Sequence, residues 1–315
     1  MTHPHPTPKA PLRIGTRGSP LALAQAVETR ARLMQAHGLE EDCFEVVVIK
    51  TTGDRVQDRP LKEIGGKGLF TKEIEEAMLD GSIDIAVHSM KDMPVTQPEG
   101  LTLGTYLPRE DVRDAFIQLD GKALQDLGEG AVVGTSSLRR RAQLLFKRPD
   151  LKVVEFRGNV QTRLRKLREG VAEATFLASA GLNRLGMAEV PRREIAADVM
   201  LPAVAQGAIG IERREDDSRV ASLLEPIHDV VTGQRLAAER AYLTALDGSC
   251  ETPIAGLATL DGATLTLRAE ILRPDGSDRL EETGSAPIED GANLGREIAQ
   301  ELLARAPEGF FDWRG

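Results

Sequence analysis

The chain has 315 residues, of which 41% are hydrophobic and 28% charged, and this length favours two or three domains over a single core. Only 3% of the residues are aromatic and the formal net charge is −9, which argues against nucleic acid as a partner. Two cysteines and the absence of any zinc-type Cys/His spacing exclude a disulfide framework and give no metal site. With no apolar signal core and no apolar run of roughly 18 residues, we expect a cytoplasmic protein without membrane contact.

Short apolar, β-branched runs alternate with segments of helical period along the chain, a pattern typical of α/β domains with largely parallel sheets. The predicted strands are 12–16, 44–50, 83–89, 101–106, 131–135, 152–156, 175–179, 208–212 and 264–272. The predicted helices are 20–37, 67–80, 138–146, 160–169, 232–246 and 294–304.

Two segments about 120 residues apart place small polar residues between a strand and a helix: 14–19 (IGTRGS) and 133–137 (VGTSS). This spacing is too long for a solenoid repeat. It predicts two similar α/β domains, although chance use of the same turn chemistry is an alternative. In the first turn Ser19 is placed to cap a helix that begins at Pro20, and the helix N-terminus with Arg17 suits a carboxylate.

A strongly basic block follows the second turn. Between Arg139 and Arg168 there are eleven Lys or Arg side chains against Asp150 and Glu155, although the whole protein is acidic. A solvated helix surface is one interpretation. A concave site for small carboxylates explains the imbalance better, because forked guanidinium groups bind carboxylates in pairs of hydrogen bonds.

Three further segments are candidate site loops. The glycine loop 65–68 (GGKG) lacks the spacing of a phosphate-binding loop, so it is either an ordinary loop or one that carries Lys67 next to a site. The strand 83–89 runs into a charged turn that contains Asp92, whereas His88 is interpreted as a buried, hydrogen-bonded histidine. Cys250 follows Gly248 in a predicted exposed turn, where a thiol is accessible but has no evident base.

Taken in order, these motifs closely resemble the porphobilinogen deaminase family, and the resemblance spans nearly the whole chain. The matching segments are TRGSPLA (16–22), GGKGLF (65–70), VHSMKD (87–92), GTSSLRR (134–140), RGN (157–159), LPA (201–203) and QGA (206–208). Cys250, within GSCETPI (248–254), resembles the cysteine to which that family attaches a dipyrromethane cofactor through a thioether.

The resemblance implies two similar α/β domains of the type II periplasmic-binding-protein class and a smaller C-terminal α+β domain. The expected boundaries are 1–107 with 206–225 for domain 1, 108–205 for domain 2, and 226–315 for domain 3. It also implies a monomeric transferase of tetrapyrrole and haem biosynthesis that condenses four porphobilinogen molecules head to tail, with loss of ammonia, to release hydroxymethylbilane.

The resemblance assigns roles residue by residue. Asp92 would be catalytic, contacting pyrrole N–H groups and stabilising positive charge as ammonia leaves. Cofactor binding would fall to Cys250, Asp92, Lys91, Thr135, Ser137, Arg139, Arg140, Arg163 and Arg184. Substrate binding would fall to Arg17, Ser19, Arg157, Phe70, Lys67 and Gln206.

Two positions depart from the family pattern. Glu63 stands where many relatives have a lysine, with Lys62 one residue earlier, which puts any lid contact from that position in doubt. Ala205 replaces a frequent glycine. The alternative functions are a non-catalytic dicarboxylate solute-binding protein, which would not need Cys250, and an interaction or regulatory domain, which would show neither turnover nor a mass adduct.

Overall fold

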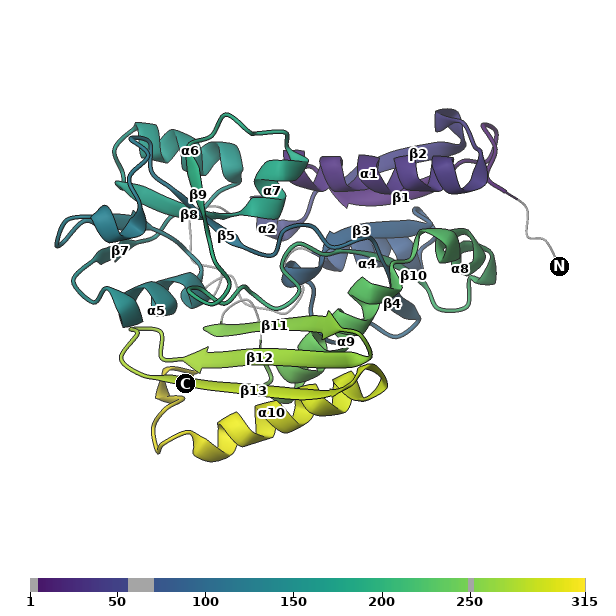
Figure 1. Cartoon of the computed structure of the whole chain (residues 1–315). Helices are drawn as coiled ribbons and strands as arrows, with labels where there is room; N and C mark the ends of the chain where they lie inside the picture. The colour runs from purple at the N-terminus through teal and green to yellow at the C-terminus, as the bar shows by residue number, and fades with distance from the viewer. Residues whose placement is uncertain (1–4, 56–70, 249–251, 315) are drawn as a thin grey trace. The chain divides into compact units, whose positions relative to one another are not determined.

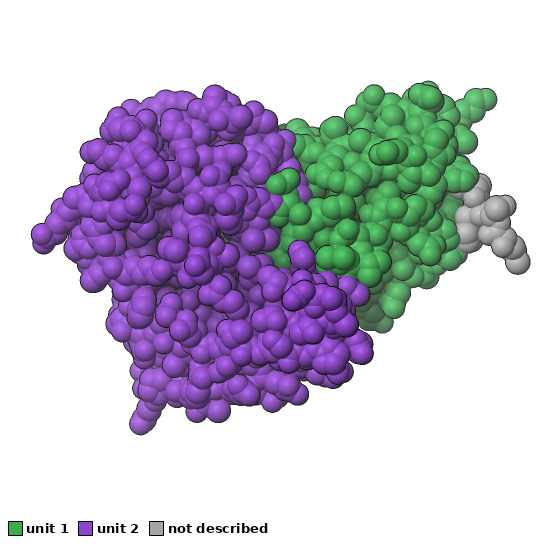
Figure 2. Space-filling model, in the orientation of Figure 1, with its two compact units in different colours: residues 1–110, 208–233 green, residues 111–207, 234–315 purple. Residues whose placement is uncertain are grey.

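The computed structural model describes residues 5–55, 71–248 and 252–314. The chain divides into two compact units: residues 1–110 with 208–233 form unit 1, and residues 111–207 with 234–315 form unit 2 (Figure 2). Unit 1 is therefore interrupted by a long segment that belongs to unit 2. The elements are labelled in Figure 1.

Unit 1 is built on a five-stranded sheet in the order β2-β1-β3-β10-β4. Its strands are β1 (Leu12–Arg17), β2 (Phe44–Ile49), β3 (Ile85–Ser89), β4 (Leu101–Tyr106) and β10 (Ile209–Arg214). β1 pairs in parallel with β2 and β3, whereas β10 runs antiparallel to both β3 and β4. The helices are α1 (Pro20–His37), α2 (Thr52–Arg55), α4 (Lys72–Leu79) and α8 (Ser218–Leu224).

The core of unit 1 follows from the apolar pattern of its strands and helices. Leu12 and Ile14 of β1, which are fully buried, pack in one cluster with Leu33 of α1 and Val220 of α8. Gly15 lies on the same strand, where an added Cβ would stand 2.3 Å from Cδ1 of Ile83, so a larger residue here would require the Ile83 side chain to move. These contacts hold β1 in the core, and the first of the two predicted turns follows its carboxyl end.

The first sheet of unit 2 has the order β7-β6-β8-β5-β9. Its strands are β5 (Asp114–Ile117), β6 (Val132–Gly134), β7 (Lys152–Val154), β8 (Ala174–Ala178) and β9 (Arg192–Ile195). Its helices are α5 (Leu138–Lys147), α6 (Val160–Arg168) and α7 (Ser179–Arg184). β6 pairs in parallel with β7 and β8, and β5 runs antiparallel to β8 and β9.

The two five-stranded sheets have the same topology. In unit 1, β1 lies between β2 and β3, and the antiparallel β10 separates β3 from β4. In unit 2, β6 lies between β7 and β8, and the antiparallel β5 separates β8 from β9. β1 and β6 occupy equivalent leading positions, and each is followed by a capped helix. The predicted pair of similar α/β domains of the type II periplasmic-binding-protein class is confirmed.

The C-terminal part of unit 2 is a smaller α+β arrangement (Figure 1). Three antiparallel strands, β11 (Ile254–Asp261), β12 (Thr264–Leu272) and β13 (Arg279–Pro287), form a sheet against which α10 (Gly291–Arg305) packs. α10 also approaches α9 (Val230–Ala245) closely, because a Cβ on Gly295 would stand 2.3 Å from the carbonyl oxygen of Ala238. This part of the fold prediction is confirmed as well.

The sequence pattern missed four strands: β5, β9, β11 and β13. The predicted helix 67–80 is observed as α4 over Lys72–Leu79, and its first four residues lie outside the described residues. The short 3-10 turns are η1 (Glu41–Cys43), η2 (Met90–Asp92), η3 (Leu124–Asp126), η4 (Glu225–Ile227), η5 (Ile288–Asp290) and η6 (Asp312–Arg314). Each sheet falls inside one of the three predicted domains, and the division at those exact boundaries stays a prediction.

Candidate active site

The turn after β1 is held by local hydrogen bonds. The hydroxyl of Ser19 accepts from the backbone N–H of Ala22 at 3.2 Å and caps α1, with Pro20 in the first turn, as predicted. Thr16, fully buried, donates from its hydroxyl to the carbonyl oxygen of Ala22 at 3.1 Å. The helix N-terminus and the half-buried Arg17 are therefore presented together, which is the arrangement that suits an anion.

A pocket in unit 1 brings this turn together with the end of β3. Its lining residues are Arg17, Ser19, Leu21, Ala22, Gln25, Thr71, Val87, His88, Ser89, Asp92 and Met93. Gln25 and Ser89 hold each other across the wall, since the Gln25 amide nitrogen donates to the Ser89 hydroxyl at 2.8 Å. We call this the unit 1 pocket. It places the predicted residues Arg17, Ser19 and Asp92 around one space.

Asp92 is the exposed carboxylate of the unit 1 pocket. It ends the turn η2, in which Met93 donates its N–H to the carbonyl of Met90 at 3.2 Å, and Pro94 follows. The N–H of Met90 donates to the carbonyl of Ala208 at 3.0 Å, so the turn is fastened to the start of β10. Lys91 lies in the same turn. A fixed backbone thus carries an accessible acidic side chain.

His88 lines the pocket but is itself buried and pairs with a carboxylate, as its interpretation as a buried histidine predicted. Its Nε2 lies 3.1 Å from Oε2 of Glu212, a residue of β10 with no exposed surface. Glu75 belongs to the same buried group, and burial raises the pKa of its carboxyl. A pairing that is fully enclosed indicates a role in holding β3 to β10.

The equivalent turn in unit 2 is also closed by its own hydroxyl groups. The Ser137 side chain accepts from the N–H of Arg140 and caps α5, and the buried Thr135 hydroxyl accepts from the N–H of Ser137 at 3.2 Å. The hydroxyl of Ser136 accepts from the N–H of Phe156 at 3.0 Å. These bonds direct the first turn of α5, and with it Arg139 and Arg140, toward the sheet.

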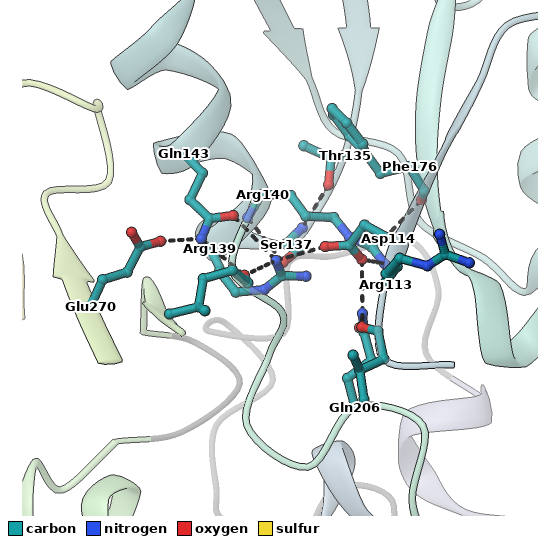
Figure 3. A network of polar contacts seen from close by, with 12 residues as sticks. Arg113, Asp114, Thr135, Ser137, Arg139, Arg140, Gln143, Phe176, Gln206 and Glu270 are labelled. Carbon is teal, nitrogen blue, oxygen red and sulfur yellow. Dashed lines mark hydrogen bonds and ion pairs between the residues drawn. The ribbon is translucent and has the colours of Figure 1, made fainter. Parts of the chain in front are cut away.

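Arg139 and Arg140 converge on a buried carboxylate that the sequence did not single out (Figure 3). Asp114 begins β5 and has no exposed surface, and each arginine approaches one of its two oxygens at 2.7 Å. Gln206 donates to the same carboxylate from Nε2 at 3.1 Å. We call Asp114, Arg139, Arg140 and Gln206 the Asp114 cluster. Burial opposes ionisation, but the two guanidinium charges outweigh it and hold the pKa of Asp114 well below its usual range.

Each arginine of the cluster also donates to a backbone carbonyl. Arg140 donates from Nη1 to the carbonyl of Phe176 at 2.9 Å, and Arg139 donates from Nη1 to the carbonyl of Leu201 at 2.9 Å. Both residues are only 4% exposed. The observed partner of these two predicted cofactor ligands is therefore Asp114 together with the chain around Leu201.

A polar chain leads from the cluster to the C-terminal sheet of the same unit (Figure 3). The side-chain oxygen of Gln143 accepts from Arg139 at 3.3 Å, and its nitrogen donates to Glu270 on β12. Burial raises the pKa of Glu270, although the hydrogen bond from Gln143 opposes this. α5 is thus linked by side chains to the sheet that follows Cys250 in the sequence.

Two further predicted residues, Arg157 and Arg163, lie at the loop between β7 and α6 and in the first turns of α6. Asn159 caps α6 by accepting from the N–H of Thr162 at 2.9 Å, and Arg163 donates from Nε to the carbonyl of Gly158 at 2.9 Å. Gly158 has φ of 119°, a conformation that favours glycine. Nη1 of the half-buried Arg157 is enclosed and has no hydrogen-bond partner among the described residues. An enclosed donor of this kind suits an anionic ligand.

Arg184, in the last turn of α7, donates from Nη2 to the carbonyl of Gly207 at 3.0 Å. Arg184 therefore contacts the residue that follows Gln206, so two predicted site residues, Arg184 and Gln206, lie at one stretch of chain. The predicted residues Lys67, Phe70 and Cys250, with the departures Lys62 and Glu63, lie outside the described residues.

Across the described parts of the chain, no group of three or more His, Cys, Asp or Glu side chains is arranged to hold a metal ion. Among the same residues, no helix is both long enough and apolar enough to cross a membrane. Each unit presents helix N-termini and cationic or hydroxyl side chains at the carboxyl ends of parallel strands. This is the class of α/β protein that binds small anionic ligands on a sheet of the periplasmic-binding-protein type.

Two family models match the chain. Residues 12–222 match "Porphobilinogen deaminase, dipyromethane cofactor binding domain" and residues 234–304 match "Porphobilinogen deaminase, C-terminal domain". The chain belongs to the porphobilinogen deaminase family. The domain that this family uses to bind its dipyrromethane cofactor is therefore present, and it covers both the unit 1 pocket and the Asp114 cluster.

Two proteins named as porphobilinogen deaminases are similar to nearly the whole of this chain. The porphobilinogen deaminase of Paracoccus denitrificans is 67% identical over 308 residues, which cover 98% of each chain. The chloroplastic porphobilinogen deaminase of Pisum sativum is 54% identical over 307 residues, covering 96% of this chain and 83% of the pea protein. Among solved structures, the periplasmic VFT2 domain of Bordetella pertussis BvgS is 17% identical with a TM-score of 0.40, covering 75% of this chain and 93% of that domain.

The predicted activity is confirmed by these matches: the chain is a transferase of tetrapyrrole biosynthesis with porphobilinogen as its substrate. The alternative of a non-catalytic dicarboxylate-binding protein is not favoured. The comparisons concern the family and its reaction, whereas the roles of single residues are argued below.

Proposed function

We propose that this chain assembles its product on a dipyrromethane held by a thioether to Cys250, with Asp92 as the catalytic residue. The single observation that supports Asp92 most strongly is its position: it is the exposed carboxylate of the unit 1 pocket, carried on a turn that is hydrogen-bonded at both ends. Cys250 is proposed from the motif GSCETPI at 248–254.

The donor set of the described residues fits a ligand that carries several carboxylates. Arg17 and the capped end of α1 offer N–H donors in unit 1, and Arg157 has an enclosed Nη1 with no hydrogen-bond partner among the residues described in unit 2. Each pyrrole of this chemistry bears two carboxylates, so a growing chain gains negative charge at every step. Guanidinium groups match that need, because they stay charged and bind carboxylates in pairs of hydrogen bonds.

When bound, the dipyrromethane supplies the pyrrole carbon from which the product chain grows. Asp92 accepts hydrogen bonds from pyrrole N–H groups and stabilises the positive charge that develops on the substrate as ammonia leaves. A carboxylate fixed beside a developing cation lowers the barrier by preorganised electrostatics, because no reorganisation is needed at the moment of reaction. Holding the two reacting pyrroles close together and correctly oriented contributes the remainder of the rate enhancement.

The basic and hydroxyl residues divide the carboxylates between them. In our proposal Arg17, Ser19, Arg157 and Gln206 bind substrate, together with Lys67 and Phe70. The cofactor groups are bound by a second set: Lys91, Asp92, Thr135, Ser137, Arg139, Arg140, Arg163 and Arg184. Thr135 and Ser137 already orient the start of α5, so their hydroxyl groups position Arg139 and Arg140 as well.

The test is the intact mass of the purified protein beside its Cys250→Ser variant, under denaturing conditions that remove noncovalent ligands. We expect a dipyrrole-sized increment on the parent and none on the variant, because serine cannot form the thioether. A parent that keeps its sequence mass even after incubation with porphobilinogen would contradict covalent attachment. The cytoplasmic location and the monomeric state stay predictions from the sequence.

A further inference from the structure

The Asp114 cluster has an excess of positive charge in a place where charge is costly. Two guanidinium groups face one carboxylate, so these side chains together keep one positive charge, and all of them are buried. A buried ionic group of this kind is a weak source of stability, because the desolvation of the ions offsets their attraction. Its arrangement therefore calls for a reason other than stability.

The geometry divides the carboxylate between the two arginines. Oδ1 of Asp114 accepts from Nη2 of Arg140 at 2.7 Å and from Nε at 3.1 Å, and it also accepts from Gln206. Oδ2 faces Nη1 of Arg139 at 2.7 Å. Arg140 also donates from Nη1 to the carbonyl of Phe176, and the Nη1 of Arg139 that faces Asp114 also donates to the carbonyl of Leu201, so contacts within the protein hold both guanidinium groups.

One donor in this arrangement is left over. Nε of Arg139 is enclosed and has no hydrogen-bond partner among the described residues. Such a donor is destabilising until an acceptor reaches it. An excess positive charge and an unsatisfied N–H on the same side chain both call for one more carboxylate.

We propose that Asp114 is a positioning residue for carboxylate binding in unit 2. By holding Arg139 and Arg140 it presents them in fixed directions and lowers their joint charge to the value that one ligand carboxylate neutralises. This inference rests on the proposed function, because the ligand carboxylate would be one of the cofactor or its pyrrole precursor. Asp114 itself does not touch the ligand.

The experiment follows cofactor loading in time. Apo protein is mixed with porphobilinogen, and the fraction that carries the dipyrrole increment is measured by intact mass for the parent, Asp114→Asn and Asp114→Glu. Asparagine keeps the shape of the side chain but leaves both arginines without their counter-ion. Glutamate keeps the charge but moves it by one methylene, so it serves if the asparagine variant does not fold. The thermal unfolding midpoint of each protein is recorded in parallel.

A matched control is available in unit 1. Asp84 is also buried, and it pairs with Arg13 at 3.0 Å and Arg214 at 3.5 Å, but it lies at the opposite end of β3 from the unit 1 pocket. Asp84→Asn should lower the unfolding midpoint and leave the loading rate within about twofold of the parent. We expect Asp114→Asn to load roughly tenfold more slowly or worse, as is typical when one partner of a buried charge pair is lost. Asp114→Glu should fall between Asp114→Asn and the parent.

Two results would overturn the proposal. Loading at the parent rate in folded Asp114→Asn or Asp114→Glu would remove the positioning role. Equal slowing in Asp84→Asn and Asp114→Asn, in proportion to lost stability, would reduce Asp114 to a structural residue. Failure of the proposed function is a different outcome, since the parent and Cys250→Ser would then both stay at their sequence masses, and the inference would fall with it.

Discussion

The unit 1 pocket and the Asp114 cluster are built on equivalent ends of equivalent sheets, yet their charged groups are in opposite situations. In unit 1, Asp92 is exposed and Arg17 is half-buried, so both can meet a ligand directly. In unit 2, Asp114, Arg139 and Arg140 are enclosed and already contact one another. The same topology thus supports an accessible acid in one unit and a preassembled cationic group in the other.

The difference separates two kinds of contribution. An exposed carboxylate can be lost with little effect on folding, because water solvates its surroundings in either case. An enclosed ion pair cannot lose one partner without leaving the other charge desolvated. Loss of the Asp92 carboxylate should therefore change turnover, and variants in the Asp114 cluster should change stability and ligand loading together.

The largest effect is expected for Asp92→Asn, measured as turnover of porphobilinogen. Loss of a charge aimed at the developing cation should lower kcat by about 10²–10³, equivalent to about 2.7–4 kcal/mol, while the cofactor stays attached. Glu99→Gln, a change of another exposed carboxylate after the same turn, is the control and should leave kcat unchanged. Near-normal product formation by Asp92→Asn would remove the charge-stabilising role.

A second effect is expected in the dependence of stability on pH. The folded-state pKa values of Asp84 and Asp114 both lie below that of an unfolded Asp, about 3.9, because their arginine partners outweigh burial. Each carboxylate therefore stabilises the fold above that pH, and its contribution is lost as the pH falls through the lowered folded-state pKa. The free energy of unfolding should drop by up to about 1.4 kcal/mol per pH unit for each such group.

Urea unfolding between about pH 5 and about pH 2, followed by circular dichroism and by Trp313 fluorescence for unit 2, measures this slope. Asp84→Asn and Asp114→Asn should each reduce the dependence of the unfolding free energy on pH. Asp114→Asn should reduce this dependence in the Trp313 fluorescence, which follows unit 2. Glu75→Gln is the control, because the contribution of Glu75 to stability changes with pH in the opposite direction. Burial raises the pKa of Glu75, so its contribution is present at low pH and lost as the pH rises through the raised value. An unchanged acid slope in both aspartate variants would contradict the assignment.

The smallest effect compares the two helix caps. Ser19→Ala and Ser137→Ala should each reduce the free energy of unfolding by about 1 kcal/mol, the usual loss for a cap hydroxyl, as measured in urea. Glycine at the same positions should cost only a few tenths of a kcal/mol. If Ser137 also binds the cofactor, Ser137→Gly will keep its stability and still load more slowly, whereas unaltered loading would restrict Ser137 to capping.

Much of this arrangement could be predicted because it depends on local signals. The cap at Ser19 and the hydroxyl-rich turn before the helix that begins at Leu138 are both predicted correctly, since a capping hydroxyl and the strand before it lie within a few residues of each other. The repeated turn also predicted two similar α/β domains. His88 was interpreted as buried from its place in an apolar strand, and it is.

What the sequence did not show depends on pairings between distant residues. Asp114 stands at the start of a four-residue strand, too short to give a period, and its partners are 25 to 92 positions away. β13 was missed because its residues LEETGSA are mostly polar, and only the pairing with β12 gives it a place. The basic block 139–168 was read as a ligand-facing wall, but the two arginines at its start face a buried acid.

Gln206 gives the fold one more property. Its side-chain nitrogen donates to the carbonyl of Val112 at 2.7 Å, across 94 positions of sequence. The two ends of the polypeptide segment between these residues are therefore held together by a hydrogen bond. Segments whose ends lie together are those that tolerate insertion and circular permutation. In terms of polypeptide topology, residues 112–206 are an insertion between the two parts of unit 1, and a short linker could join the chain at the point where the insertion begins and ends.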